Sequence, residues 1–395
     1  MKETLGDKDW TLKTYDLKPA SEGLAGFLGD HFKITLHAQY QECRREVKLF
    51  VKHLPIENKP KAQFISVNGF FKREMIMSRL FEEMPRISDA PDWHAKVYVY
   101  NESLIVMPDL LHEGYKLWPR SEVFDLQHLT LTTEALARFH ASFTNYETRR
   151  SIIEKRIYKV VEDHGDILNE FQYSDTPWLR TAAKVAKDYI GVFSSKFSGE
   201  IPGIEERFIE TTETFMEYKD TLNVVIHKDL WVDNIMFKYV NDAPMHALLI
   251  DFQSVRYGPP AFDLMIMLYL NTSREFRERY EREILNHYYS IFINSLEKAS
   301  RERIEKLPYS IEEFLLWCEK ARSFAIMCTG CLLPYTLMDA KSAEEVFNCA
   351  ESFERLTNED RSAPVVAYAR RSPGYRGRLL EVFEEFAERY VTGAS

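Results

Sequence analysis

The stretch of sequence that decides the fold is a polar loop between two apolar runs. It reads Val225-Ile226-His227-Lys228-Asp229-Leu230-Trp231-Val232-Asp233-Asn234-Ile235-Met236-Phe237, and Leu248-Leu249-Ile250-Asp251-Phe252-Gln253 follows. The residues just before His227, residues 235–240 and residues 247–250 are rich in apolar and β-branched side chains, which predicts three strands. Residues 241–244, Asn-Asp-Ala-Pro, predict the turn of a hairpin between the last two strands.

This hairpin is expected to bring several polar residues together. It returns Asp251 to the neighbourhood of Asn234, beside the loop that carries His227 and Asp229. The spacing H-x-D-x-x-x-x-N, followed by an Asp at a strand end, is typical of kinases, in which one Asp accepts the proton of the attacking hydroxyl. The pattern therefore predicts Asp229 and His227 as catalytic residues. It predicts Asn234 and Asp251 as ligands of Mg²⁺, which prefers oxygen; the alternative is that these residues only cap strands and turns.

The same run resembles the ecdysteroid kinase-like family, in the aminoglycoside phosphotransferase and choline kinase group of the protein-kinase-like superfamily. The resemblance lies in His-x-Asp-Leu-Trp-Val-x-Asn-Ile-Met-Phe and in Ile-Asp-Phe-Gln. It implies an α+β, bilobal protein-kinase-like fold. Residues 1–110 would form a small nucleotide-binding lobe with an antiparallel sheet and a helix, and residues 111–395 a larger, mostly helical catalytic and substrate-binding lobe. Lys228 departs from the Gly usual between His and Asp, and Asp233 from the Asn common before the metal-binding Asn.

Two elements near the N-terminus predict the lysine–glutamate pair that kinases place on the α- and β-phosphates of ATP. Residues 46–52 alternate as a strand that ends at Lys52, and residues 70–81 have the spacing of a helix that carries Glu74. Residues 32–38 alternate as a further strand. Lys52 and Glu74 are therefore expected to meet in the nucleotide site, although a lysine that closes a strand is also commonly solvated.

A glycine-rich segment, residues 21–30, precedes the first of these strands. Glycine permits the tight backbone and the close phosphate approach that a phosphate-binding loop needs. Gly26 and Gly29 are the candidates for this role. An ordinary glycine-rich turn is the alternative.

Residues 97–110 predict a hairpin that leads to the hinge between the lobes. The resemblance implies that adenine meets backbone groups here, where the family has Glu-Asp-Leu and this chain has Pro108 in place of Glu. Proline lacks a backbone N–H. Adenine contacts are therefore expected from Met107 and from the residues after Asp109, with Asp109 itself counted in the nucleotide site.

Most of the chain after residue 110 predicts helices. Helical periodicity covers residues 152–169, 178–195, 204–219, 274–296, 311–337, 343–356 and 376–391, and further helices are expected to start near residues 133 and 260. Asp263 lies in a first helical turn and is expected to brace the catalytic loop, as it does in the group that the chain resembles, or only to favour the helix dipole. His140 is expected to pack or hydrogen-bond in the core rather than to catalyse.

Composition excludes some classes of partner. The net charge is −10, from 51 basic and 61 acidic residues, which argues against a general nucleic-acid binder. The N-terminus has no apolar signal-peptide core, and residues 264–270 are too few to cross a bilayer, so no membrane association and a cytoplasmic location are expected. No protein partner is implied. The five cysteines make no disulfide framework, and Cys328 and Cys331 are expected to be buried, reduced thiols.

The resemblance implies an ATP- and Mg²⁺-dependent kinase acting on a hydroxyl of a hydrophobic small-molecule alcohol, an ecdysteroid or a related polyhydroxylated steroid. Two alternatives remain: a choline- or aminoglycoside-type kinase, and a catalytically silent relative that binds nucleotide. A protein kinase is disfavoured, because the chain lacks an Ala-Pro-Glu segment and only residues 252–262 separate Asp251 from Asp263. Trp231 is expected either to line the acceptor side of the cleft or to pack within the catalytic loop.

Overall fold

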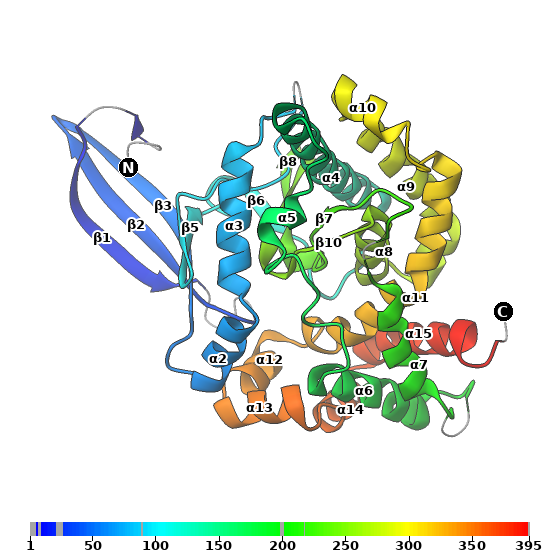
Figure 1. Ribbon diagram of the computed structural model, residues 1–395. Coiled ribbons are helices and arrows are strands. Elements are labelled where there is room, and N and C mark those ends of the chain that lie inside the picture. The colour runs from blue at the N-terminus through cyan, green and yellow to red at the C-terminus, as the bar shows by residue number, and fades with distance from the viewer. Residues whose placement is uncertain are drawn as a thin grey trace.

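An antiparallel sheet forms the core of the smaller, N-terminal lobe (Figure 1). The computed structural model describes residues 5–6, 9–20, 27–87, 90–197, 201–216 and 218–393. The strands lie in the order β1-β2-β3-β5-β4. Their bounds are β1 Thr11–Pro19, β2 Asp30–Tyr40, β3 Cys43–His53, β4 Val99–Asn101 and β5 Leu104–Pro108. The predicted strands at residues 32–38 and 46–52 and the hairpin after residue 97 are thus confirmed.

Among the described residues of this lobe, two helices flank the sheet. They are α2 Lys59–Val67 and α3 Phe70–Glu83, and Gly69 between them adopts a left-handed φ of 65° that suits glycine. Phe70, Phe71 and Ile65 pack with Ile105 of β5 in one apolar cluster. Because that cluster fixes α3 against the sheet, Glu74 on α3 faces Lys52, near the end of β3.

Helices dominate the larger, C-terminal lobe. They are α4 Leu126–Glu154, α5 Val160–His164, α6 Pro177–Phe193, α7 Ile204–Glu210, α8 Pro260–Asn271, α9 Arg274–Asn294, α10 Lys298–Ile304, α11 Ile311–Thr336, α12 Ala340–Phe347, α13 Ala350–Asn358, α14 Ser362–Arg371 and α15 Pro373–Tyr390. Short 3-10 turns are η1 Thr211–Thr214, η2 Val232–Asn234 and η3 Phe252–Ser254. The protein therefore has the predicted α+β, bilobal architecture, while a boundary at residue 110 stays a prediction.

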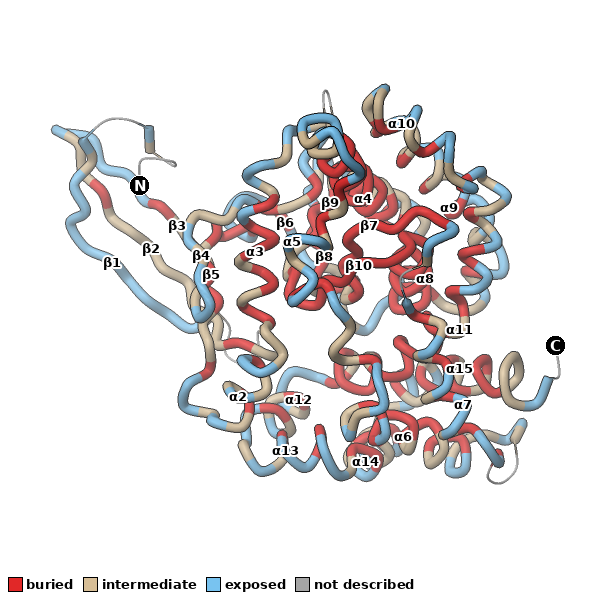
Figure 2. The backbone as a smooth tube through the Cα atoms, in the orientation of Figure 1, coloured by how far each residue is buried: buried red, intermediate tan, exposed pale blue. Residues whose placement is uncertain are grey.

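Two small sheets carry the polar loop of the C-terminal lobe. One pairs β10 Arg256–Gly258 with β7 Val224–Ile226, and the other has the order β6-β8-β9, with β6 Tyr115–Leu117, β8 Ile235–Val240 and β9 Ala243–Leu249. β8 and β9 form the predicted hairpin, with Ile235 opposite Leu249. Figure 2 shows β7, β10 and α8 buried and β1 exposed. The loop is thus supported by the best-protected part of the molecule.

Several predicted helices are shorter than expected. The helix predicted over residues 152–169 is wrong, because α4 ends at Glu154, Lys155 turns with a φ of 55° and only residues 160–164 are helical again. There the backbone N–H of Val160 donates to the buried carboxylate of Glu147, a contact that a straight helix excludes. The helix predicted over residues 204–219 ends early and is followed by a 3-10 turn. The helix predicted over residues 343–356 is divided into α12 and α13.

The C-terminal helices reach the smaller lobe. The ring of Phe347 on α12 lies 4.9 Å from that of Phe27, and the ring of Phe353 on α13 lies 5.7 Å from that of Phe64 on α2. The side-chain amide of Asn58 donates to a backbone carbonyl at residue 348, at 3.1 Å. Figure 1 shows α2 beside α12 and α13. A second junction therefore joins the lobes.

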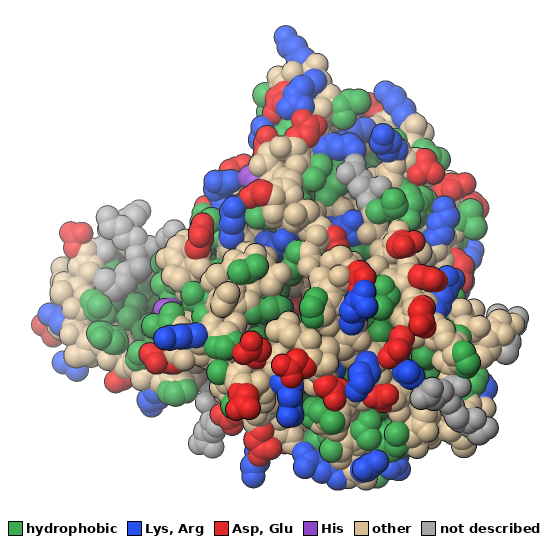
Figure 3. All heavy atoms as spheres, turned by 60° about the horizontal axis from the view of Figure 1, so that its bottom comes forward, with side chains coloured by type: hydrophobic (Ala, Val, Ile, Leu, Met, Phe, Trp, Pro, Cys, Tyr) green, Lys and Arg blue, Asp and Glu red, His purple; other side chains and the backbone are tan. Residues whose placement is uncertain are grey.

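The burial of the cysteines and the charges on the surface can be compared with the sequence predictions. Cys318, Cys328 and Cys331 are buried and free, as predicted for the last two, while Cys43 and Cys349 are exposed. Basic and acidic side chains mix on the face that comes forward in Figure 3. Within the described ranges no single helix is long and apolar enough to cross a membrane; α11 and α12 pass such a test only together, across a 98° bend. The cytoplasmic location stays a prediction.

Candidate active site

The polar loop runs from β7 to β8 and folds back on its own backbone. Lys228 has a φ of 70° and Asp251, after β9, a φ of 67°. Left-handed backbone is strained for residues other than glycine, and such strain collects at functional sites. The side-chain amide of Asn234 donates to the backbone carbonyl of Asp229 at 2.7 Å. The backbone N–H of Ile250 donates to the carbonyl of Asn234 at 3.0 Å. The loop and the end of the hairpin are therefore fixed together.

Asp263, at the start of α8, supports this loop from behind. Its carboxylate accepts the backbone N–H groups of His227 at 2.6 Å and of Lys228 at 2.8 Å, and it accepts His140 Nε2–H at 3.1 Å. Nδ1 of His140 accepts from Tyr288 Oη at 2.6 Å. Burial alone would raise the pKa of Asp263, but His140 and the other donors hold it below its usual value. The bracing contact expected for Asp263 and the core position expected for His140 are both present.

His227 faces the loop rather than the cleft. Its Nε2–H donates to the backbone carbonyl of Ile250 at 2.9 Å, and its Nδ1 accepts from the backbone N–H of Asp229 at 3.3 Å. The side chain is fully buried, and burial lowers the pKa of the ring, which is therefore neutral near pH 7. The expectation that His227 takes part directly in catalysis does not fit this geometry. The ring instead positions Asp229 against the strand end.

Asp229 lines the cleft, which is where a general base is needed. Burial raises the pKa of its carboxyl to about 8, and the nearby charge of Asp251 adds to this, while Lys52 and Lys228 oppose it. A carboxylate poised near neutral pH is suited to accept a proton from a hydroxyl group.

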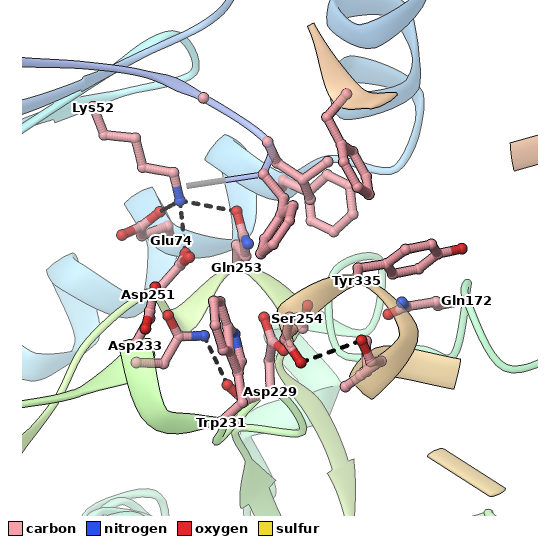
Figure 4. A pocket seen from close by; sticks show the side chains of 18 of the residues that line it. Lys52, Glu74, Gln172, Asp229, Trp231, Asp233, Asp251, Gln253, Ser254 and Tyr335 are labelled. Carbon is pink, nitrogen blue, oxygen red and sulfur yellow. Dashed lines mark hydrogen bonds and ion pairs between the residues drawn. The ribbon is translucent and has the colours of Figure 1, made fainter. Parts of the chain in front are cut away.

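Lys52 is the centre of a buried polar cluster (Figure 4). Its Nζ lies 2.8 Å from Glu74 Oε2, 2.6 Å from Asp251 Oδ1 and 2.8 Å from Gln253 Oε1. Burial alone would lower the pKa of Lys52, but Asp251 and Glu74 raise it, so the amine is charged. The predicted Lys52–Glu74 pair is present. Gln253 was missed as a site residue, although a Gln after Asp-Phe, where protein kinases have Gly, was the available signal.

Asn234 and Asp251 offer oxygen ligands at one edge of this cluster. The amide nitrogen of Asn234 is used by the backbone of Asp229, so its Oδ1 is free to face the cleft. No group of three His, Cys, Asp or Glu side chains suited to a metal occurs among the residues described. A hard cation that keeps waters and binds phosphate oxygens needs only one or two protein ligands. The pair therefore fits Mg²⁺ held jointly with a triphosphate.

The nucleotide candidates separate into two groups. Gly29 and Met107 line the cleft, whereas Asp109 does not and instead forms an ion pair with Lys33 at 3.1 Å. A Cβ on Gly29 would lie 3.2 Å from Cγ of Lys52, so glycine permits a close approach there. Gly26 lies outside the described residues. His31, a residue that sequence reasoning missed, also lines the cleft and stacks on Phe50 with ring centres 5.4 Å apart.

The far walls of the cleft are largely apolar. The cleft holds about 1280 Å³ of unfilled space, part of it open to solvent. Its apolar lining includes Phe27, Phe64, Phe70, Trp178, Trp231, Leu332, Phe347, Phe353 and Leu356. Trp231 lines the cleft and packs with Phe27 of the N-terminal lobe, 5.5 Å between ring centres, while its place on the acceptor side stays a prediction. Asp233 is paired with Arg120, whose guanidinium lies over the Trp231 ring.

A bilobal fold with a Lys–Glu pair and an H-x-D-x-x-x-x-N loop defines a protein of the kinase-like class. The profile of the ecdysteroid kinase-like family matches residues 24–301. The chain belongs to that family, which confirms the resemblance of the loop sequence.

Individual relatives are more distant. An uncharacterized kinase-like protein of Caenorhabditis elegans is 28% identical over 173 residues, which cover 43% of this chain and 42% of that protein. The chain thus matches less than half the length of this relative.

Solved structures give a weaker likeness. The ethanolamine kinase of Plasmodium vivax is 12% identical, with 92% of this chain and 83% of that chain covered and a TM-score of 0.41. The GDP complex of aminoglycoside 2'-phosphotransferase-IIIa is 9% identical, with 98% and 96% covered and a TM-score of 0.39. These overlaps cover most of each chain, but their identities and TM-scores are low, so the assignment rests on the family match.

Proposed function

We propose that this protein transfers the γ-phosphate of ATP to a hydroxyl group of a hydrophobic alcohol. The observation that carries the proposal is that Lys52, Asp229 and Asp251 converge at one end of a cleft whose far walls are apolar. A charged end suits a triphosphate, and apolar walls with few polar groups suit a lipid-like acceptor. The two halves of one cleft thus match the two substrates of a small-molecule kinase.

The roles of the residues follow from their positions. Lys52 would bind the α- and β-phosphates, and Glu74 and Gln253 would hold its amine in place. Asn234 and Asp251 would hold Mg²⁺, which neutralises charge that develops on the phosphates during transfer. Asp229 would orient the acceptor hydroxyl and accept its proton as the new P–O bond forms and the bond from the γ-phosphorus to the bridging oxygen of ADP breaks.

The acceptor class is inferred from the wall opposite Lys52. The aromatic and aliphatic side chains there gain most from a large apolar ligand. An ecdysteroid or a related polyhydroxylated steroid has such a body together with hydroxyl groups. Choline is a small cation and aminoglycosides are strongly hydrated polycations, so neither matches a large apolar wall, and we expect both to be poor substrates. A second candidate, a choline-type kinase, is favoured only by the aromatic rings, which can also bind a quaternary cation.

A single set of assays tests the proposal. The purified protein is incubated with γ-labelled ATP and Mg²⁺ and, in turn, with an ecdysteroid, choline and kanamycin; Asp229→Asn is the control for catalysis. We expect labelled product from the ecdysteroid, lost on chelation of Mg²⁺ and in the variant. Efficient turnover of choline without any turnover of steroid would instead establish the second candidate. Binding of ATP without phosphorylation of any acceptor would identify a silent relative.

A further inference from the structure

A loop between α5 and α6 forms part of the apolar end of the cleft. Gln172, Tyr173 and, at the start of α6, Trp178 line the cavity from this side. Figure 4 shows Gln172 beside Tyr335, across the cleft from Lys52. We infer that Gln172 recognises a second polar group of the acceptor, and that Glu170 and Lys228 hold Gln172 in position for this task. The inference rests on the proposed function and adds to it a determinant of specificity.

The side-chain amide of Gln172 is the first observation. Within the part of the chain that the structure describes, this amide has no hydrogen-bond partner, although Trp178 and Leu332 give the wall around it an apolar character. Among the neighbouring polar groups, Thr336 donates to a helix carbonyl and Tyr173 shares a hydrogen bond with Cys328, whereas the buried hydroxyl of Tyr335 has no partner among the described residues. An apolar ligand that covered Gln172 would remove water from the amide without replacing it, at a cost of roughly 1–3 kcal/mol. An acceptor with a hydroxyl or ketone there avoids that cost.

Glu170 fixes the backbone on which Gln172 stands. Its Oε1 accepts the backbone N–H groups of Phe171, Gln172 and Tyr173, at 3.1, 2.8 and 2.7 Å. Three successive N–H groups wrapped around one carboxylate form a rigid, anion-centred turn. The turn therefore fixes the backbone of Gln172 and the direction in which its side chain leaves the backbone.

Lys228 ties this turn to the catalytic loop. Its Nζ lies 3.1 Å from each carboxylate oxygen of Glu170, and it also lies over the rings of Phe171 and Tyr173, 4.7 and 5.3 Å from their centres. The side chain is 1% exposed. Arg256 adds a second cation, 3.6 Å from Glu170. Lys228 thus connects the residue before Asp229 to the wall that carries Gln172.

An acceptor would consequently be held at two points. One hydroxyl meets Asp229, and a second polar group meets the amide of Gln172, with the apolar body between them against Trp231 and Trp178. Because the amide both donates and accepts, a hydroxyl and a ketone are equally suitable. Alcohols with a single polar group lose this second contact, so the site selects for polyfunctional acceptors.

The test compares Gln172→Leu, which keeps the volume and removes the amide, with Thr357→Val on the same cleft as the matched control. The Thr357 hydroxyl donates to the carbonyl of Phe353 within its own helix, at 2.9 Å, so its loss should leave acceptor binding unchanged. For Gln172→Leu we expect the KM of an ecdysteroid to rise about 5- to 100-fold, with kcat within about threefold and the KM of ATP unchanged. Cholesterol, which has one hydroxyl, should bind the Gln172→Leu variant at least as tightly as the wild type, because the variant no longer has an amide to desolvate.

Lys228 is tested as a positioning residue. Lys228→Met keeps the length of the side chain and removes its charge, and Lys228→Arg restores the charge. We expect the Met variant to raise the KM of the ecdysteroid, the Arg variant to recover part of the loss, and the effects of Lys228→Met and Gln172→Leu to be non-additive. Additive losses would show that Lys228 does not act through Gln172. If Lys228→Met fails to fold, Glu170→Gln provides the same comparison.

The two proposals fail in different ways. Binding is followed separately from turnover by the fluorescence of Trp178 and Trp231, both of which line the cleft. A wild-type protein that binds no ecdysteroid overturns the proposed acceptor class and this inference with it. A wild-type protein that binds and phosphorylates the ecdysteroid, together with an unchanged Gln172→Leu variant, overturns the inference about Gln172 alone.

Discussion

The catalytic loop and the start of α8 each carry a buried or nearly buried aspartate, and the pKa values of the two carboxyls shift in opposite directions. Asp263 is fully buried, accepts two backbone N–H groups and a histidine N–H, and has a lowered pKa. Asp229 keeps some access to the cleft, yet burial and the charge of Asp251 raise its pKa to about 8. Depth of burial alone would predict the reverse order.

The difference lies in what surrounds each carboxylate. Donors that point at a charged oxygen stabilise the ionised form, whereas an apolar or like-charged environment opposes it. Asp263 is therefore built to support the backbone, and Asp229 is left poorly compensated, as a reactive group has to be. Under the proposed function, mutations that replace each carboxylate by an amide should separate the two: loss of Asp263 should lower stability, and loss of Asp229 should lower activity.

The largest effect is expected for Asp263→Asn. The variant loses the charge that holds the N–H groups of His227 and Lys228, and it leaves His140 without an anionic partner. Breaking such a buried charged network typically costs about 3–5 kcal/mol of unfolding free energy. Urea unfolding followed by circular dichroism measures this. A midpoint equal to that of the wild type would show that Asp263 is not the brace.

The converse is expected for Asp229→Asn. The amide keeps the shape of the side chain and removes the proton acceptor, so turnover should fall by about 10²-fold or more. Stability should stay the same or rise, because repulsion from Asp251 is relieved. Steady-state kinetics and thermal unfolding of the same preparation give both numbers. Turnover close to that of the wild type would remove Asp229 from the mechanism.

A smaller effect is expected at Lys52, whose three partners again differ in charge. Gln253→Leu removes the neutral partner and leaves Glu74 and Asp251 in place. A hydrogen bond to a charged group contributes about 1.5–3 kcal/mol; because both carboxylates remain on the amine, kcat/KM for ATP should fall by about tenfold, at the lower end of that range. The effect should vanish when Lys52 is already Met. A further loss in the double variant would mean that Gln253 acts by another route.

The smallest effect is expected on the pH dependence of stability, at Glu147 on α4, outside the cleft. Its buried carboxyl has a pKa raised to about 7 by burial, against Arg303, Tyr257 and the N–H of Val160. In the unfolded chain a Glu titrates near pH 4.3, roughly. Between these values the folded state holds a proton that the unfolded state has lost, so stability falls as the pH rises. Glu147→Gln should flatten the decline in Tm between about pH 4.3 and 7, and an unchanged slope would contradict this.

The parts of the site that follow from local sequence could be predicted. The H-x-D-x-x-x-x-N loop, its hairpin and the Lys52–Glu74 pair depend on strand and helix periods that can be read over a few residues. The position of Asp263 in a first helical turn was also predicted from the local sequence, and its bracing role was implied by the family resemblance. His227 was placed correctly in the loop, but the direction of its ring depends on the carbonyl of Ile250, which only the fold supplies.

Other features depend on contacts between distant residues. The contact between Lys228 and Glu170 joins positions 58 residues apart, and the one between Lys52 and Gln253 joins positions 201 apart. The break after α4 depends on a buried carboxylate that caps Val160. β1 carries no usable signal, because its residues are exposed along its whole length. Periodicity reports only which face of an element is buried, so none of these could be read from it.

The contact of α12 and α13 with the smaller lobe affects how fast the cleft can open. Lobes of kinases separate to exchange ligands, and here the separation must also part the ring contacts of Phe347 with Phe27 and of Phe353 with Phe64. Such contacts are worth about 0.5–1.5 kcal/mol each beyond the area they bury. They therefore break and re-form readily. We therefore expect these two pairs of rings to affect the residence time of the acceptor as well as its affinity.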